Sequence, residues 1–185
     1  MKRLALILMA ICLALPLTAS AVTITFDEYA VGTSIGGQYS GSGVWFSNWD
    51  TPNLPVIAAD VDNPTSPVLS GSPTFTGGFW MGFVTPQNHV SFDSGYWNSI
   101  GTGFVRVQDA SLNVLADLTN PATGIYTFDL NYADIKYITF SPGADPAGAD
   151  IDNLTFGAVP EPSTMLLLGS GLLGLVGYGS RRLKK

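Results

Sequence analysis

The chain has 185 residues, of which 46% are hydrophobic, enough for one domain around one core. Six of its eight basic side chains lie in the first three and last five positions. Between Val22 and Val159, two cations, Arg106 and Lys136, therefore oppose 13 carboxylates, a net charge of −11. Such a body is repelled by nucleic acid and by anionic lipid. The single cysteine, Cys12, lies in an N-terminal apolar run, which excludes disulfides and thiol catalysis from the rest of the chain.

The N-terminus has the three parts of a secretory signal peptide. A basic start, Met1-Lys2-Arg3, precedes an apolar run from Leu4 to Leu17, and Ala19-Ser20-Ala21 supplies the small residues of a cleavage site. We therefore predict a signal peptide over residues 1–21, with cleavage after Ala21, and an exported mature chain.

From Val22 onward, short apolar runs are separated by Gly, Pro, Asn, Asp and Ser. No run keeps a 3.6-residue apolar period over a helical length, whereas alternation with period two indicates strands. A proline-punctuated loop is predicted over 52–73, with an apolar run at 54–59 that is too short for a helix. The pattern predicts an all-β fold, an antiparallel β-sandwich over residues 22–157. The predicted strands are Val22–Phe26, Gly43–Trp49, Phe79–Val84, His89–Phe92, Gly103–Gln108, Asn113–Leu115, Gly124–Leu130, Ile135–Ser141 and Ile151–Phe156.

The C-terminal stretch, residues 158–185, has three parts in order. Val159 precedes the motif Pro160-Glu161-Pro162, and the 18 residues 163–180 carry no charge. That length is about the minimum for a helix that crosses a membrane. The basic tail 181–185, which begins Arg181-Arg182, would hold this end on the cytoplasmic side.

These three parts resemble the PEP-CTERM family of bacterial sorting signals. The resemblance implies an exported protein that an exosortase processes near Pro160-Glu161-Pro162, with the membrane as a transient anchor. It also implies a destination at the cell surface or in the extracellular matrix of a Gram-negative-type bacterium.

The order of the strands carries a second resemblance. The segments that carry it are Ile24–Asp27, Gly43–Ser47, Val105–Ser111, Ile135–Phe140 and Ile151–Phe156. They resemble the jelly-roll modules common in PEP-CTERM proteins and are similar to carbohydrate-binding domains. The resemblance implies a jelly-roll-like sandwich, without naming a ligand.

Strand parity suggests a metal site. Continuing the alternation of the first strand puts Glu28 on the core face, and stepping back from Leu154 puts Asp152 there too. If the first and last strands pair, the two carboxylates meet, and hard oxygen ligands suit Ca²⁺. Carbohydrate-binding jelly rolls often carry a structural calcium near the chain ends, so we predict a calcium site of Glu28 and Asp152, with Asp27 or Asp150 as further ligands. The alternative is that Asp152 accepts backbone N–H groups at a turn and Glu28 is solvated.

Aromatic side chains are the second candidate site. With Val44 and Phe46 on the core face, Trp45 and Trp49 share the opposite face, about 13 Å apart. Trp97, with Tyr96 and Trp80 nearby in sequence, adds further flat rings. Exposed rings of this kind stack on sugars, so Trp45, Trp49 and Trp97 are candidate ligand-binding residues for an exopolysaccharide. The alternative is that the tryptophans fill a second buried face.

No catalytic constellation is evident, and we expect the protein not to be an enzyme. His89 is the one histidine, no G-x-S-x-G elbow surrounds a serine, and a lone strand histidine is usually structural. One histidine without cysteine disfavours zinc. The sequence thus favours a surface protein that binds polysaccharide; the rivals are a structural or adhesive matrix protein and, with less support, a secreted hydrolase.

Overall fold

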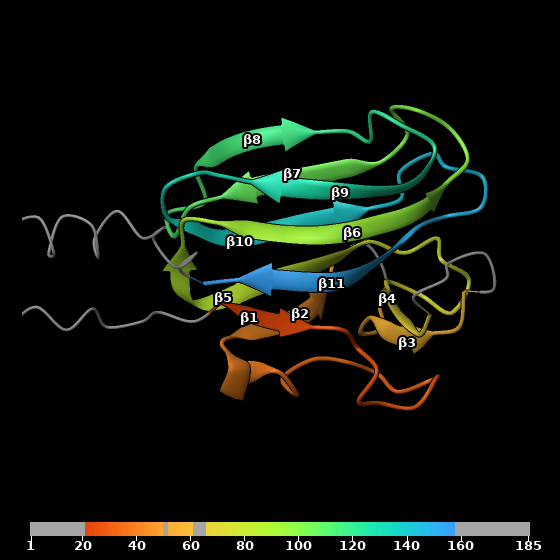
Figure 1. The fold of residues 1–185 in the computed structure, drawn as a ribbon, viewed down its shortest axis with the longest axis horizontal. Helices are drawn as coiled ribbons and strands as arrows, with labels where there is room; N and C mark the ends of the chain where they lie inside the picture. The colour runs from red at the N-terminus through yellow and green to blue at the C-terminus, as the bar shows by residue number, and fades with distance from the viewer. Residues whose placement is uncertain (1–20, 50–51, 61–65, 158–185) are drawn as a thin grey trace, which may run out of the picture. The chain divides into compact units, whose positions relative to one another are not determined.

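In the residues that the structure describes, 21–49, 52–60 and 66–157 of a computed structural model, eleven strands form two antiparallel sheets packed against each other (Figure 1). These residues fall within one compact unit. The predicted signal peptide up to Ser20, and the sorting signal from residue 158 onward, lie outside the described residues. The predicted antiparallel β-sandwich is confirmed.

One sheet has six strands and the other has five. The order in the six-stranded sheet is β3 (Val56–Ala58), β4 (Val68–Ser70), β11 (Asp150–Phe156), β6 (Val90–Trp97) and β9 (Gly124–Leu130), with β1 (Val22–Ile24) beside β11. The order in the five-stranded sheet is β2 (Val44–Asn48), β5 (Phe79–Gln87), β10 (Ile135–Ser141), β7 (Phe104–Gln108) and β8 (Val114–Leu118). A short 3₁₀ turn, η1 (Ser40–Ser42), precedes β2.

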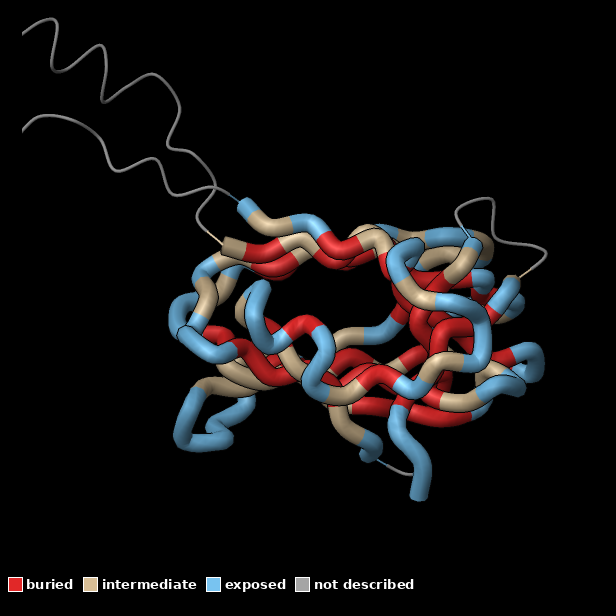
Figure 2. The backbone as a smooth tube through the Cα atoms, turned by 90° about the horizontal axis from the view of Figure 1, so that it is seen from below, coloured by how far each residue is buried: buried red, intermediate tan, exposed pale blue. Residues whose placement is uncertain are grey.

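The core lies between the two sheets. Phe83 of β5 packs on Phe156 of β11 with ring centroids 5.1 Å apart, and Phe140 of β10 meets Phe92 of β6 at 6.3 Å. All four side chains are at least 97% buried, and each contributes roughly 1.5–3 kcal/mol of transfer free energy. Figure 2 shows buried residues along the strands of both layers, with exposed residues gathered at the turns.

The first and last strands pair, as predicted. β1 runs antiparallel to β11, with Val22 opposite Phe156 and Ile24 opposite Leu154. The hydroxyl oxygens of Thr23 and Thr155 lie 2.9 Å apart across this pair. The beginning and the end of the domain are therefore held side by side in the six-stranded sheet.

Three strand predictions need correction. β3 and β4 lie inside the segment that was predicted as a loop. The sequence did not predict them because each has only three residues, too few to show an alternation of apolar and polar positions. β1 ends at Ile24 instead of Phe26, since Phe26 adopts a left-handed backbone with φ 59°. His89 was predicted on a strand, but it belongs to the two-residue passage by which the chain leaves β5 for β6 in the other sheet.

The predicted orientation of Asp152 is also wrong. A β-bulge lies between Asp152 and Thr155, where Asn153 has φ 51°. As a result Ile151 and Leu154 both point into the core, and Asp152 lies directly opposite Asp93 on the outward side of the sheet. Simple alternation from Leu154 fails because the bulge adds one residue to the strand.

Candidate functional site

Five aromatic side chains gather on the outer side of the five-stranded sheet. They lie opposite in parity to core residues of the same strands: Trp80 alternates with Phe79 and Met81, and Tyr137 precedes Ile138. The register aligns them in rows, because Trp45 and Tyr137 both pair with Gly82 of the strand between them. We call the five residues Trp45, Trp49, Trp80, Phe104 and Tyr137 the aromatic face.

Trp45 lies flat against the sheet because its neighbour on β5 has no side chain. A Cβ added to Gly82 would lie 2.2–2.9 Å from atoms of the Trp45 ring, so only glycine leaves room for this orientation. The Trp45 ring then meets Tyr137 edge-on, with centroids 6.3 Å apart, and Trp80 lies 6.3 Å from Tyr137 on the other side. These three partly exposed rings form one continuous cluster.

Trp49 repeats the same arrangement at the end of β2. A Cβ on Gly78 would lie 2.7 Å from the Trp49 ring, which covers this glycine and stacks on Phe104 of β7 at 5.8 Å with an interplanar angle of 21°. Trp49 is 45% exposed. The prediction that Trp45 and Trp49 share the face opposite to the core is confirmed, whereas ligand binding by them stays a prediction.

A charged pair borders these rings. The guanidinium carbon of Arg106 lies 5.2 Å from the centroid of Phe104, within the range of a cation–π contact. Nε and Nη2 of Arg106 donate to the two carboxylate oxygens of Asp117, at 2.7 and 2.8 Å. These hydrogen bonds lower the pKa of Asp117 and raise the pKa of Arg106, so both side chains are charged at neutral pH.

Trp97 does not belong to this site. It is completely buried, packs against Phe140 at 6.1 Å, and lies against Gly103, where a Cβ would lie 2.3 Å from its ring. The prediction that Trp97 binds a ligand is therefore wrong, because its ring has no access to solvent. Conversely, Phe104 and Tyr137 were missed, although their parity against Val105 and Ile138 is visible in the sequence.

The predicted calcium ligands do not assemble into a metal site. In the described part of the chain, no group of three or more His, Cys, Asp or Glu side chains is arranged to hold a metal ion. Glu28 is exposed and accepts a hydrogen bond from the Tyr39 hydroxyl at 2.8 Å, and Asp27 is exposed beside it. Burial and the Glu28 carboxylate together raise the pKa of Tyr39.

Asp150 and Asp152, the other two predicted ligands, lie on β11 and are buried. Asp152 accepts the backbone N–H of Asn153 at 2.7 Å, which is the turn role considered as the alternative. These residues do not fit the predicted calcium coordination, so calcium binding stays a prediction without a ligand set.

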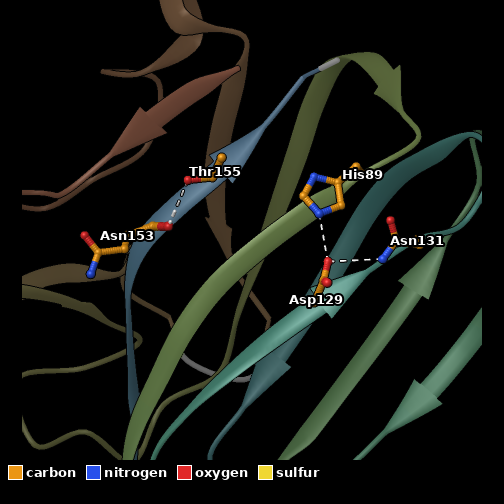
Figure 3. A network of polar contacts seen from close by, with 5 residues as sticks. All are labelled: His89, Asp129, Asn131, Asn153 and Thr155. Atoms are coloured by element: carbon orange, nitrogen blue, oxygen red, sulfur yellow. Dashed lines mark hydrogen bonds and ion pairs between the residues drawn. The ribbon is translucent and has the colours of Figure 1, made fainter. Parts of the chain in front are cut away.

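The outer side of the six-stranded sheet is polar. We call six of its outward polar residues the polar face: Thr23, Ser91, Asp93, Thr127, Asp129 and Thr155. Beside this face, His89 Nε2 lies 2.7 Å from Asp129 Oδ1, and the Asn131 amide donates to the same oxygen at 3.1 Å (Figure 3). Among the described residues, the His89 ring is hydrogen-bonded to Asp129 and to no serine hydroxyl.

A groove of about 450 Å³ lies outside the aromatic face. It is lined by small residues around Tyr96, which is 43% exposed, together with Phe75, Asp60 and Asn98. Tyr96 is thus an exposed aromatic residue outside the aromatic face, and it is a useful reference for mutagenesis.

The comparisons with known proteins bear on the C-terminus and on the fold. Residues 158–182 match the PEP-CTERM protein-sorting motif, which confirms the predicted sorting signal. No curated protein matches the chain. In the described part of the chain, no helix is long and apolar enough to cross a membrane; the predicted span at 163–180 lies outside that part.

Among solved structures, the fold is similar to carbohydrate-binding modules. A CBM29-2 mutant complexed with cellulohexaose is 14% identical to this chain, with a TM-score of 0.43. The alignment covers 77% of this chain and 93% of the CBM29-2 chain. A family 29 carbohydrate-binding module is 13% identical with a TM-score of 0.42, covering 79% and 97%. The K2 cleaved adhesin domain of Lys-gingipain is 14% identical with a TM-score of 0.38, covering 74% and 99%. At these TM-scores the likeness carries no argument about a ligand.

Proposed function

We propose that this chain is an exported, non-catalytic surface or matrix protein whose aromatic face binds polysaccharide. The observation that carries the proposal is the gathering of five aromatic rings, supplied by β2, β5, β7 and β10 and by Trp49 just after β2, on the solvent side of one sheet. A single exposed ring needs no explanation, but a contiguous apolar patch on a sheet face is typical of a binding surface.

The chemistry of the rings suits sugars. The C–H faces of a pyranose are apolar and its hydroxyls lie at the rim, so a flat indole can cover one face while the hydroxyls stay solvated. Trp45 lies flat on Gly82 of β5 and Trp49 on Gly78 just before β5, and rings held in this way keep few free rotamers. Because they lose little conformational entropy on binding, they are efficient contact groups.

The sorting signal supports the destination. The motif Pro160-Glu161-Pro162 after Val159, with Arg181-Arg182 beyond the uncharged stretch, falls within the matched residues 158–182. We propose that an exosortase is the processing partner and that the membrane is a transient anchor. A polysaccharide of the cell surface or matrix is then the ligand that this domain would meet.

The proposal can be tested by pull-down with insoluble polysaccharides. The full-length protein is solubilised in a polyoxyethylene detergent, since glycoside detergents would compete for the rings. It is then mixed with microcrystalline cellulose, with chitin and with the exopolysaccharide of the producing organism. We expect retention on at least one polymer by the wild type and by Tyr96→Ala, and loss of retention in Trp45→Ala and Trp49→Ala. Retention by all variants alike would contradict a role for the aromatic face.

Each pull-down is carried out once with calcium and once with EDTA, which distinguishes calcium-dependent from calcium-independent binding of the polysaccharide. Binding lost in EDTA would support the predicted calcium requirement, and binding indifferent to EDTA would remove calcium from the proposal while keeping the sugar. No retention on any polymer would favour a structural matrix protein without a defined ligand.

A further inference from the structure

The acidic domain holds only two basic side chains in its described residues, and both are engaged. Lys136 Nζ donates to the backbone oxygen of Val84 at 2.9 Å, and Arg106 is paired with Asp117. Eleven carboxylates lie in the same described ranges. A polyanion that approaches the described part of this domain therefore meets net negative charge, and Arg106, the cation beside the aromatic face, is already paired.

The Arg106–Asp117 pair is placed where a ligand on the aromatic face would meet it. Arg106 and Asp117 are direct register partners on β7 and β8, and Arg106 also pairs with Thr139 in the row that contains Trp80. The pair is bidentate, so both carboxylate oxygens of Asp117 and two of the guanidinium N–H groups are already used. The side chains are 39% and 47% exposed, which leaves the pair open to solvent and ligand.

From this placement we propose that Asp117 determines ligand class: it keeps Arg106 in an ion pair and so restricts the aromatic face to uncharged glycans. The inference rests on the proposed function and names the ligand class of the same face. An acidic sugar at Arg106 would have to displace Asp117 or share the guanidinium with it beside the carboxylate charge, so it gains no net ion pair. An uncharged glycan needs only the rings, so the pair does not oppose it.

The test frees Arg106 and compares polymers that differ only in charge. The full-length protein in a polyoxyethylene detergent is run through gels containing hydroxyethyl cellulose or carboxymethyl cellulose, and methyl-esterified or free polygalacturonate, at about 0.01 M and about 1 M ionic strength. The variants are Asp117→Asn and the double variant Asp117→Asn with Arg106→Gln. Asp129→Asn, on the polar face, is the matched control for loss of one negative charge. Circular dichroism melting checks that each variant is folded.

We expect Asp117→Asn to bind the acidic polymers about tenfold more tightly than the wild type at low salt, the gain expected of one charge-assisted hydrogen bond. The gain should vanish at high salt, in the double variant and in Asp129→Asn, while binding to the uncharged polymers stays within about twofold.

Equal gains in Asp117→Asn and Asp129→Asn would overturn the inference, since net charge alone would then explain them. No gain in Asp117→Asn, or equal wild-type affinity for the charged and uncharged members of a pair, would overturn it as well. Failure of the proposed function is distinguishable, because there the wild type is retained on none of the insoluble polymers.

Discussion

The outer sides of the two sheets differ in the side chains that they expose to solvent. On the polar face, Asp93 accepts hydrogen bonds from Thr127 and from the Asn153 amide, and Thr23 pairs with Thr155, so neighbouring strands satisfy one another. On the aromatic face, by contrast, the Trp45 ring meets Tyr137 edge-on and Trp49 stacks on Phe104, with one ion pair at the border. Both sheets contribute buried apolar side chains to the core between them.

The two faces differ in whether they follow the ordinary pattern of a one-sided sheet. A sheet exposed on one side needs only alternation of apolar and polar residues, and the polar face follows that rule. The aromatic face departs from it, and departures of this kind are typical of functional surfaces. The following experiments test whether the two faces differ in function as they differ in chemistry.

The largest expected effect is on the core that both faces share. Trp97→Ala removes a fully buried ring that contacts Phe140, and should lower the free energy of unfolding by about 3–5 kcal/mol. Denaturant unfolding measures it. Glycan binding should fall only in conditions where the variant unfolds; loss of binding by a folded Trp97→Ala would mean that the core ring reaches the ligand.

Gly82→Ala should disturb the aromatic face while keeping all of its rings. The new methyl group would collide with the Trp45 ring and push it off the sheet, so glycan affinity should fall about tenfold, comparable to loss of an interface anchor. Affinity gels measure this change, with Gly41→Ala as control, since no atom lies within 4 Å of a Cβ there and its φ is outside the left-handed region. Unchanged affinity would show that the flat orientation of Trp45 does not matter.

Thr127→Val should affect the polar face alone. It keeps the shape of the side chain but removes the hydroxyl that donates to Asp93, and should destabilise the domain by about 1 kcal/mol or less because both groups are solvent-accessible. Thermal melting measures the stability, and glycan retention should stay at the wild-type level. A variant that is stable but no longer retained would place the ligand on this face instead.

The smallest effect concerns pH and the Arg106–Asp117 pair. Because the pKa of Asp117 in the folded protein lies below its ordinary value of 3.8, the pair contributes fully above that pH and loses its contribution as the pH falls through the folded value. The small stability difference between wild type and Asp117→Asn should therefore be constant from pH 7 to about 4 and disappear in stronger acid. A difference that fades between pH 7 and 5 would contradict the lowered pKa.

Strand parity predicted the placement of Trp45 and Trp49 because β2 alternates without interruption against Val44 and Phe46. The same reasoning failed for Asp152, where Asn153 takes a left-handed conformation that no local pattern announces. It gave no answer for Trp97, since β6 carries its own irregularity between Ser94 and Trp97. Parity is therefore reliable only within strands that have no bulge.

The assembly of the aromatic face depends on strand order, which the sequence does not state. Phe104 and Trp49 are 55 positions apart and meet because β5 and β10 lie between their strands and because Gly78, just before β5, has no side chain in the way of the Trp49 ring. The individual outward rings could be read from alternation. Their contacts required the register of four strands.

The pairing of β1 with β11 has a consequence for how this chain matures. β1 is synthesised first among the strands and its one partner strand last, so the hydroxyls of Thr23 and Thr155 must find each other across 132 positions of chain. Contacts this distant in sequence make folding slow, because the entropy of closing the loop is lost before the contact is gained. The N-terminal strand thus stays without its partner strand until the last strand has been synthesised, so the six-stranded sheet is completed late in the production of the chain.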